Sequence, residues 1–143
     1  MRAYLDTNVI VDVLKDSRES HLDSATILKL ARQGYIEAVV STQTVLDAYY
    51  LFSVAGKYPL EEFKLFLSTL LSAVSVTSIS ENNLKAAIRS ANRDFEDASQ
   101  IDCASTGGCD CIISSDRKMK RDSPVPVHTP AEFCGMIFKP WHY

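Results

Sequence analysis

Four aspartates spread along the chain have positions from which they could act together as a metal site. Asp6 and Asp116 each come at the end of a short stretch that reads as a buried strand. Asp47 and Asp97 fall in the first turns of expected helices. Carboxylates that share one site raise one another's pKa, and a hard cation such as Mg²⁺ or Mn²⁺ relieves this repulsion. The four aspartates are therefore the candidate metal ligands and catalytic residues.

A divalent cation in such a cluster supports the hydrolysis of phosphodiesters. It lowers the pKa of a bound water and stabilises the charge that develops on the phosphorus oxygens. It also receives the charge of a nucleic acid, which a chain of net charge −3 does not attract by itself. Asn8 and Ser115 are expected to orient the carboxylates as uncharged hydrogen-bond donors.

One cluster of basic residues follows the last of these aspartates. It consists of Arg117, Lys118, Lys120 and Arg121. These side chains are expected to bind phosphates of the substrate that flank the reacting one. The alternative interpretation of the same cluster is a solvated loop.

Other polar residues near these motifs need a separate interpretation. Asp94, Glu96 and Asp97 are too close in sequence for all three to face one place on a helix. Asp94 is the expected N-cap, which puts Asp97 at the third helical position. Asp12 is interpreted as a solvated helix residue, and His128 as a turn residue rather than a general base.

The elements that must position these residues alternate between strands and helices. Strands are predicted at residues 4–5, 36–40, 74–79, 111–113 and 125–128. Helical periodicity in the intervening segments predicts parallel strands with right-handed crossovers, in a three-layer α/β/α sandwich around a mainly parallel five-stranded sheet. Because the carboxyl ends of parallel strands meet at one edge, all four aspartates can converge there.

Composition predicts a single domain over residues 1–143, since 46% of the residues are hydrophobic. Neither a signal sequence nor a membrane-spanning stretch is recognisable, so we expect a cytoplasmic protein that does not contact membranes. The tail from Phe138 to Tyr143 is expected to dock on the domain or on a partner. The cysteines form no C-x-x-C pair and are expected to be free thiols: Cys103, Cys109, Cys111 and Cys134.

The motifs around the aspartates resemble those of the PIN-domain ribonucleases, particularly the VapC-like toxins of prokaryotic toxin–antitoxin pairs. The similarity runs, in the family's order, through residues 5–10, 42–47, 94–98 and 113–116. It implies that the four acids of the family correspond here to Asp6, Asp47, Asp97 and Asp116, with Ser115 in the hydroxyl position.

What the resemblance implies is an endoribonuclease that depends on Mg²⁺ or Mn²⁺ and cleaves RNA. Members of the family are often homodimers and are often inhibited by an antitoxin protein. One position departs from the pattern, because Asp47 stands where the family usually has glutamate. Its carboxylate is therefore held back by one methylene, which bears on direct coordination of a cation.

Two other functions stay open on the sequence. A haloacid-dehalogenase-like phosphatase also begins with an aspartate at a strand end, but it requires a second aspartate two positions later, where this chain has Asn8. The second alternative is a module without enzymatic activity, whose acidic pocket binds a metal or a protein.

Overall fold

The five strands found within the described residues form one parallel sheet. In the computed structural model, which describes residues 1–139, the strand order is β3-β2-β1-β4-β5. The strands are β1 (Arg2–Leu5), β2 (Glu37–Ser41), β3 (Val74–Thr77), β4 (Cys111–Ile113) and β5 (Val127–His128). Every neighbouring pair is parallel. The predicted five-stranded parallel sheet is confirmed.

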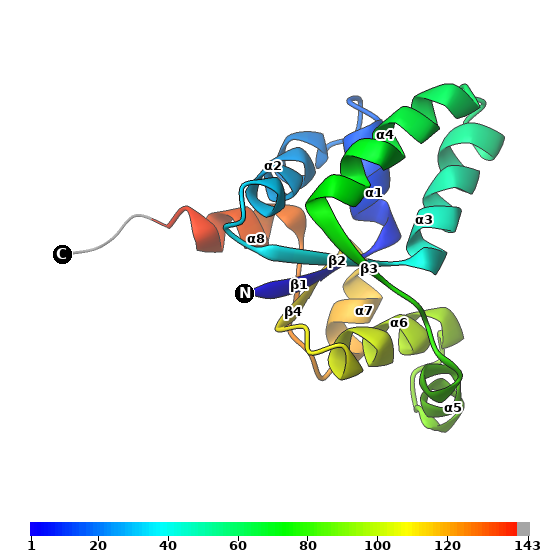
Figure 1. Cartoon of the computed structure of the whole chain (residues 1–143). Coiled ribbons are helices and arrows are strands. Elements are labelled where there is room, and N and C mark those ends of the chain that lie inside the picture. Colours follow the sequence, from blue (N-terminus) through cyan, green and yellow to red (C-terminus); the bar gives the residue numbers. More distant parts are fainter. Residues whose placement is uncertain (140–143) are drawn as a thin grey trace.

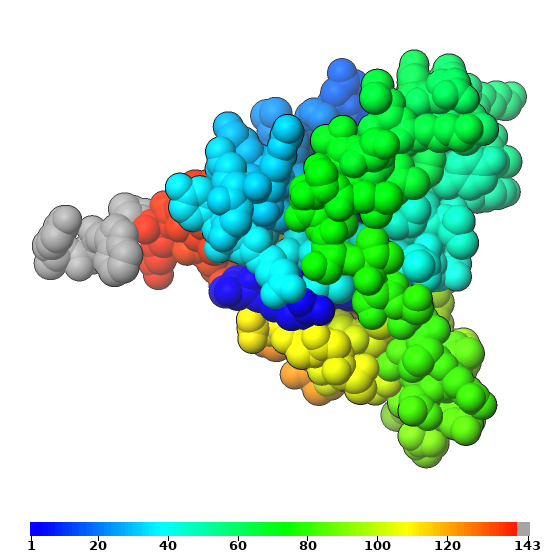
Figure 2. Space-filling view, in the orientation of Figure 1, coloured from blue at the N-terminus to red at the C-terminus, as the bar shows by residue number. Residues whose placement is uncertain are grey.

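Helices cover both faces of this sheet. Those on one side are α1 (Thr7–Leu14), α2 (His21–Arg32), α3 (Thr42–Tyr49), α4 (Leu60–Ala73) and α8 (Pro130–Ile137). Those on the other side are α5 (Glu81–Arg89), α6 (Phe95–Thr106) and α7 (Arg117–Asp122) (Figure 1). In the space-filling view the start of β1, in blue, lies at the surface between the two helical layers (Figure 2). The three-layer α/β/α sandwich is therefore confirmed.

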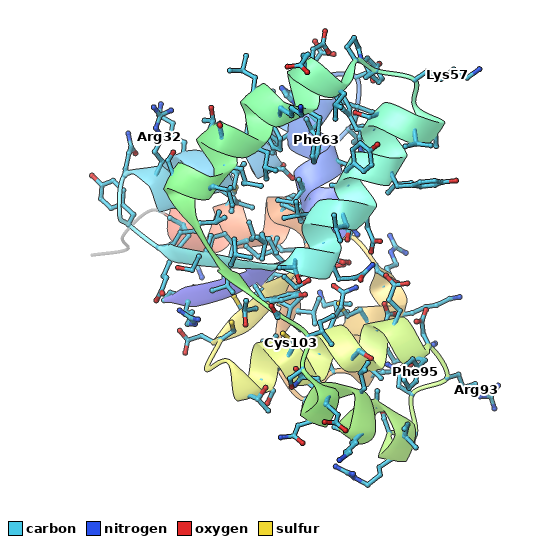
Figure 3. The ribbon with its side chains drawn as sticks, turned by 45° about the vertical axis from the view of Figure 1, so that its right-hand side comes forward. Arg32, Lys57, Phe63, Arg93, Phe95 and Cys103 are labelled. Atoms are coloured by element: carbon cyan, nitrogen blue, oxygen red, sulfur yellow. The ribbon has the colours of Figure 1, made fainter. Side chains whose placement is uncertain are left out.

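Alternate residues of the central strands pack in two separate hydrophobic cores, one on each face of the sheet. Leu5 and Ile113 are buried against the layer of α1, α2, α3, α4 and α8, and Tyr4 and Ile112 against α6 and α7. Among the side chains labelled in Figure 3, Phe63 belongs to the first core and Cys103 to the second. Burial on both faces explains why these strands are uniformly apolar rather than alternating with polar residues.

Several element boundaries differ from the sequence prediction. Strand β3 ends at Thr77, and the basic cluster lies on the short helix α7 rather than in a loop. Residues Tyr50–Ala55 continue α3 as a π-helical segment, η1. This segment ends at Gly56, where a Cβ atom would lie 2.5 Å from the carbonyl oxygen of Phe52. Such π-helical turns are rare and are frequently found at functional sites.

The remaining predictions on composition have separate outcomes. All four cysteines are free thiols, as expected. None of the helices within residues 1–139 is long and apolar enough to cross a bilayer. The predicted docking of the tail falls mainly on residues 140–143, which lie outside the described residues.

Candidate active site

Asp6 and Asp116 lie side by side because the strands that precede them are neighbours. Strands β1 and β4 pair in parallel up to Leu5 and Ile113, and each aspartate follows as the N-cap of the next helix. The hydroxyl of Ser114 connects the two residues, since its Oγ donates to Oδ2 of Asp6 at 2.7 Å and accepts from the backbone N–H of Asp116 at 3.0 Å. Asp6 and Asp116, the two aspartates that follow strands, therefore lie close together as the sequence predicted.

Asp97 approaches the same place from α6. Asp94 caps this helix and accepts from the backbone N–H of Asp97 at 3.0 Å, so Asp97 stands at the third helical position as expected. Only 8% of Asp97 is exposed, and its Oδ2 atom is buried without a hydrogen-bond partner in the described part of the chain. Burial, reinforced by the charges of Asp94, Asp116 and Asp6, raises the pKa of Asp97 to about 7.

Asp6 has the same kind of environment but more donors. Burial raises the pKa of Asp6, the charge of Asp116 adds to the effect, and hydrogen bonds from Ser114, Thr7 and Asn8 oppose it. Asn8 donates from Nδ2 to Oδ2 of Asp6 at 3.2 Å, which is the orienting contact that the sequence predicted for it.

Asp47 lies across the cavity on α3 and faces an acid that the sequence analysis gave no role. Asp47 is half-buried and accepts from Nε2 of Gln43 at 2.8 Å. Opposite it on α6 is Glu96, whose pKa is raised first by burial and then by the charge of Asp47. Glu96 could not be recognised from the sequence, because helical spacing says that it diverges from Asp97 but not which of the two meets another element.

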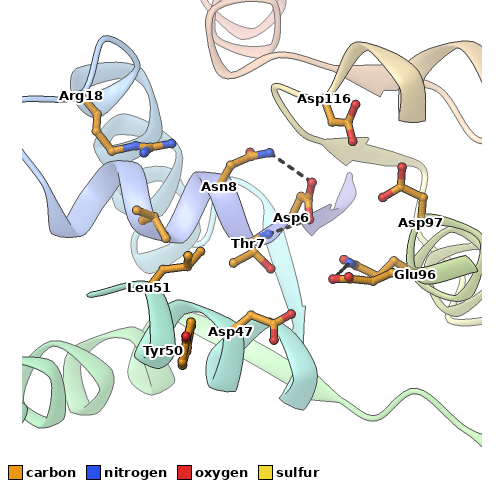
Figure 4. A pocket seen from close by; sticks show the side chains of 12 residues that line it. Asp6, Thr7, Asn8, Arg18, Asp47, Tyr50, Leu51, Glu96, Asp97 and Asp116 are labelled. Atoms are coloured by element: carbon orange, nitrogen blue, oxygen red, sulfur yellow. Dashed lines mark hydrogen bonds between the residues drawn. The ribbon is translucent and has the colours of Figure 1, made fainter. Parts of the chain in front are cut away.

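The four aspartates line one open cavity of about 420 Å³ at the carboxyl edge of the sheet. Figure 4 shows Asp6, Asp97 and Asp116 pointing toward a common space, with Asp47 on the opposite wall and Glu96 between Asp97 and Asp47. The cavity is lined by Asp6, Thr7, Asn8, Val11, Arg18, Asp47, Tyr50, Leu51, Glu96, Asp97, Gln100 and Asp116. The convergence that the sequence predicted for the four acids is thus present in the structure.

The orienting hydroxyl differs from the expected one. Ser115 is exposed, and it contacts the site through its backbone N–H, which donates to Oδ1 of Asn8 at 3.2 Å. The hydroxyl that donates to Asp6 belongs to Ser114, which is 1% exposed. Strand β4 ends at Ile113, and the next residue, Ser114, turns inward, whereas the sequence prediction named Ser115 for this role.

The four basic residues of α7 flank the cavity without lining it. Lys120 pairs with Glu132 at 2.6 Å, and Arg121 lies 3.8 Å from Asp122. Arg117 and Lys118 are exposed and have no ion pair within residues 1–139.

Asp12 corrects the sequence interpretation, because it is buried rather than solvated. Its exposed fraction is 3%. Oδ1 accepts from Nε of Arg18 at 2.7 Å and Oδ2 from Oγ of Ser24 at 2.9 Å. Arg18 itself lines the acidic cavity, a second residue that the sequence analysis missed. No periodic signal reveals it, since it lies in the loop between α1 and α2.

The chemistry of the cavity fits a hard divalent cation. The donors are carboxylate oxygens, one of them buried and unpartnered. Burial, and then the charges of neighbouring carboxylates, raise the pKa of Asp6 and Asp97. Within residues 1–139 no three His, Cys, Asp or Glu side chains stand ready to ligate one ion. This arrangement suits a cation that keeps several water ligands and binds one or two carboxylates directly, as Mg²⁺ does.

Fold and site together define the class: a parallel α/β domain with a carboxylate cavity at its sheet edge. A family model described as "PIN domain" matches residues 2–118, so the chain belongs to the PIN-domain family. The chain is 26% identical over 141 residues to Ribonuclease VapC1 of Aquifex aeolicus (strain VF5), and the match covers 93% of both proteins.

Solved structures show the same fold at low sequence identity. Mycobacterium tuberculosis VapC20, described as a sarcin-ricin loop cleaving toxin, matches with a TM-score of 0.65 and 13% identity, over 83% of this chain and 93% of that one. VapBC2 from Rickettsia felis, solved bound to a DNA fragment from its promoter, matches with a TM-score of 0.68 and 15% identity, over 90% and 98%. These similarities place the fold among VapC structures.

Proposed function

We propose that this protein is an endoribonuclease that depends on Mg²⁺ or Mn²⁺ and acts as the toxin of a toxin–antitoxin pair. The observation that carries the proposal is the buried, unpartnered Oδ2 of Asp97 in a cavity shared with Asp6 and Asp116. An isolated carboxylate oxygen in such a place costs free energy unless a cation or a proton compensates it. Membership of the PIN-domain family and the similarity to Ribonuclease VapC1 support the same function.

One or two of the aspartates Asp6, Asp97 and Asp116 are proposed as direct ligands, the rest of these three and Asp47 as ligands through water. Asp6, Asp97 and Asp116 share one side of the cavity, whereas Asp47 is on the other wall and is shorter than the usual glutamate. A bound cation supplies a water of lowered pKa and a positive charge against the phosphate oxygens. Ser114 and Asn8 hold the carboxylate of Asp6 in its orientation, and Glu96 adds a second carboxylate on the side of Asp47.

The substrate surface is proposed to extend from the cavity onto α7 and η1. Arg117 and Lys118 are exposed at the start of α7 and are suited to contact phosphates, whereas Lys120 is engaged by Glu132 and Arg121 lies beside Asp122. Across the cavity Tyr50 is 57% exposed, and its ring offers a stacking surface for an unpaired base.

The proposed partners are RNA, an antitoxin protein and a second copy of the chain, in the cytoplasm. Large apolar side chains remain exposed on α3, η1 and α4, among them Leu46, Val54 and Leu65. An apolar surface of this kind is typical of a protein interface. The toxin assignment also follows from the similarity to VapC proteins.

The test is a cleavage assay on single-stranded and structured RNA. Wild-type protein is expected to cleave RNA in the presence of Mg²⁺ or Mn²⁺. A chelator is expected to abolish cleavage, because the carboxylates alone cannot supply the positive charge that stabilises the phosphate oxygens. Asp6→Asn and Asp97→Asn keep the shape of the side chain and are expected to reduce cleavage by on the order of 10²-fold or more. Thermal unfolding of each variant confirms that it is folded.

The same assay separates the two alternative functions. Turnover of a phosphate monoester without RNA cleavage would support the phosphatase, although Asn8 donates to Asp6 at the position where that mechanism needs a second carboxylate. Absence of both activities from folded wild-type protein with either metal would contradict the enzyme and support a binding module.

A further inference from the structure

We propose that Arg18 binds a phosphate of the RNA next to the one that is cleaved, and that Asp12 is the residue that positions it. The inference rests on the proposed ribonuclease function and assigns part of its substrate contacts. Within residues 1–139, Arg18 is the only basic side chain that lines the acidic cavity. The basic residues of α7, by contrast, lie outside its lining.

The environment of Asp12 explains how Arg18 is held. Asp12 is buried on α1, one helical turn after Asn8. Its two carboxylate oxygens have different partners, Nε of Arg18 at 2.7 Å and Oγ of Ser24 at 2.9 Å. Nδ1 of His21 lies 2.8 Å from the backbone carbonyl oxygen of Asp12 and donates to it, because a carbonyl can only accept. Asp12 is thus fixed from three directions.

The guanidinium of Arg18 is anchored through one of its nitrogens only. Among the described residues neither Nη group of Arg18 donates a hydrogen bond to protein, and 40% of the side chain is exposed. Figure 4 shows the guanidinium extending along α1 toward Asn8 and the cavity. Because Ser24 occupies the second oxygen of Asp12, the ion pair leaves the outer part of the guanidinium free for a ligand.

The backbone around Arg18 is also ordered. The N–H of Arg18 donates to the carbonyl of Lys15 at 3.1 Å, and the carbonyl of Arg18 accepts from the N–H of His21 at 3.1 Å. Two consecutive turns therefore fix the loop that carries it. An arginine whose rotamer is already restrained loses less conformational entropy on binding than a free one, so a bound phosphate gains more net free energy.

Charge and chemistry identify the ligand as a phosphate. The Arg18 guanidinium has no ion pair with Asp6, Asp97 or Asp116, so it does not neutralise the proposed metal ligands. A planar guanidinium presents paired N–H donors that match a phosphate in a bidentate contact. Positive charge beside an acid-lined cavity compensates the repulsion that an RNA backbone meets there.

The test is RNA binding without cleavage. Asp97→Asn is used as the parent protein in Mg²⁺, and affinity for a fluorescein-labelled single-stranded RNA of mixed sequence is measured by anisotropy over a range of salt concentrations. Adding Arg18→Gln is expected to weaken binding roughly tenfold, as for a lost charge-assisted hydrogen bond. The slope of log K against log salt is expected to become shallower by about 0.7, the value for one phosphate on a single strand.

The matched control is Arg32→Gln. Arg32 is the last residue of α2, is exposed, and lies on the far side of the molecule from Arg93 and α6 in Figure 3. This variant loses the same charge, and its affinity and salt slope are expected to equal those of the parent. Equal effects of the two substitutions would overturn the proposal, because they would show only the effect of net charge.

A second variant guards against loss of folding. Removing Arg18 alone leaves Asp12 buried without its cation, which destabilises the loop. The double substitution Asp12→Asn and Arg18→Gln leaves two neutral side chains that can still form a hydrogen bond. Its RNA affinity is expected to remain roughly tenfold weaker than that of the parent protein. Recovery of the parent affinity would overturn the proposal, since Arg18 would then act only through stability. If neither the parent nor the wild-type protein binds RNA, the ribonuclease proposal fails, and this inference fails with it.

Discussion

The two edges of the sheet differ in how their charged side chains are arranged. At the amino edge, Arg2 donates from Nε to the carbonyl of Gly107 at 3.0 Å and pairs with Glu37, and its backbone N–H donates to Oδ2 of Asp110 at 2.8 Å. Figure 2 shows the start of β1 in contact with the cyan and yellow segments that supply these partners. At the carboxyl edge, Asp6, Asp97 and Asp116 line one cavity, and none of them has an ion pair within residues 1–139.

The charged groups at the amino edge stabilise the fold, whereas the carboxylates at the carboxyl edge are suited to bind a ligand. Opposite charges at the amino edge satisfy one another, and each exposed pair contributes little, about 0–1 kcal/mol. At the carboxyl edge, burial and the charges of neighbouring carboxylates raise the pKa of Asp6 and Asp97, so their ionised forms cost free energy in the metal-free protein. Groups with strongly perturbed pKa values in a cavity are typical of functional sites.

Two aspartates that flank one strand test the difference between the two edges most directly. Asp110 precedes β4 at the amino edge, and Asp116 follows it at the carboxyl edge. Asp116→Asn is expected to reduce RNA cleavage by on the order of 10²-fold, because it removes a proposed metal ligand. Asp110→Asn is expected to leave cleavage unchanged and to lower the free energy of unfolding by about 1 kcal/mol or less.

Cleavage rates and denaturant unfolding of both variants give the two readouts. The comparison fails if Asp110→Asn slows cleavage as much as Asp116→Asn, since the amino edge would then contribute to the chemistry. It fails equally if Asp116→Asn keeps full activity.

Divalent cations are expected to stabilise the protein through the carboxyl edge only. A cation that binds only the folded protein stabilises it by about 2.7 kcal/mol at 100 times its Kd, which corresponds to roughly 8 °C in Tm for a domain of this size. Asp97→Asn is expected to show a much smaller increase with Mn²⁺ or Mg²⁺ in differential scanning fluorimetry. Asp110→Asn, the matched control, is expected to show the full increase.

An equal increase of Tm in all three proteins would mean that the cation binds elsewhere. No increase in the wild type, at any concentration that leaves the protein soluble, would contradict a metal site at the carboxyl edge.

Much of this architecture follows from local sequence patterns. The alternation of apolar strands with capped helices predicts the parallel sheet, and parallel strands bring Asp6 and Asp116 to one edge. Cap chemistry is equally local: Thr129 and Glu132 form the expected capping box of α8, and Asp94 caps α6. These features are predictable because each depends on residues a few positions apart.

What the sequence could not predict depends on contacts between distant segments. The burial of Asp12 follows from Arg18 and Ser24, which no periodicity assigns to it. The choice of Ser114 over Ser115 depends on which residue turns inward after β4. Glu96 joins the cavity only because α3 places Asp47 opposite it. In each case tertiary packing decides what the local pattern leaves open.

The pH dependence of the metal-free protein tests whether ionised carboxylates at the carboxyl edge cost free energy. The pKa of Asp97 is about 7 in the folded protein against an ordinary value of 3.8. Below the lower value both the folded and the unfolded chain are protonated there, and no cost arises. Between the two values the unfolded chain loses the proton that the folded one keeps, so stability falls as pH rises and levels off above about 7.

Asp97→Asn removes this titration, because its amide is neutral at every pH. In chelator the Tm of the wild type relative to the variant is therefore expected to decrease as pH rises from below 3.8 to about 7, and to stay constant above it. A bound cation prefers the ionised carboxylate, so with Mn²⁺ the same difference should instead rise with pH. If the difference in Tm between the two proteins is the same at all pH values, with and without metal, Asp97 is not the residue whose ionisation costs free energy.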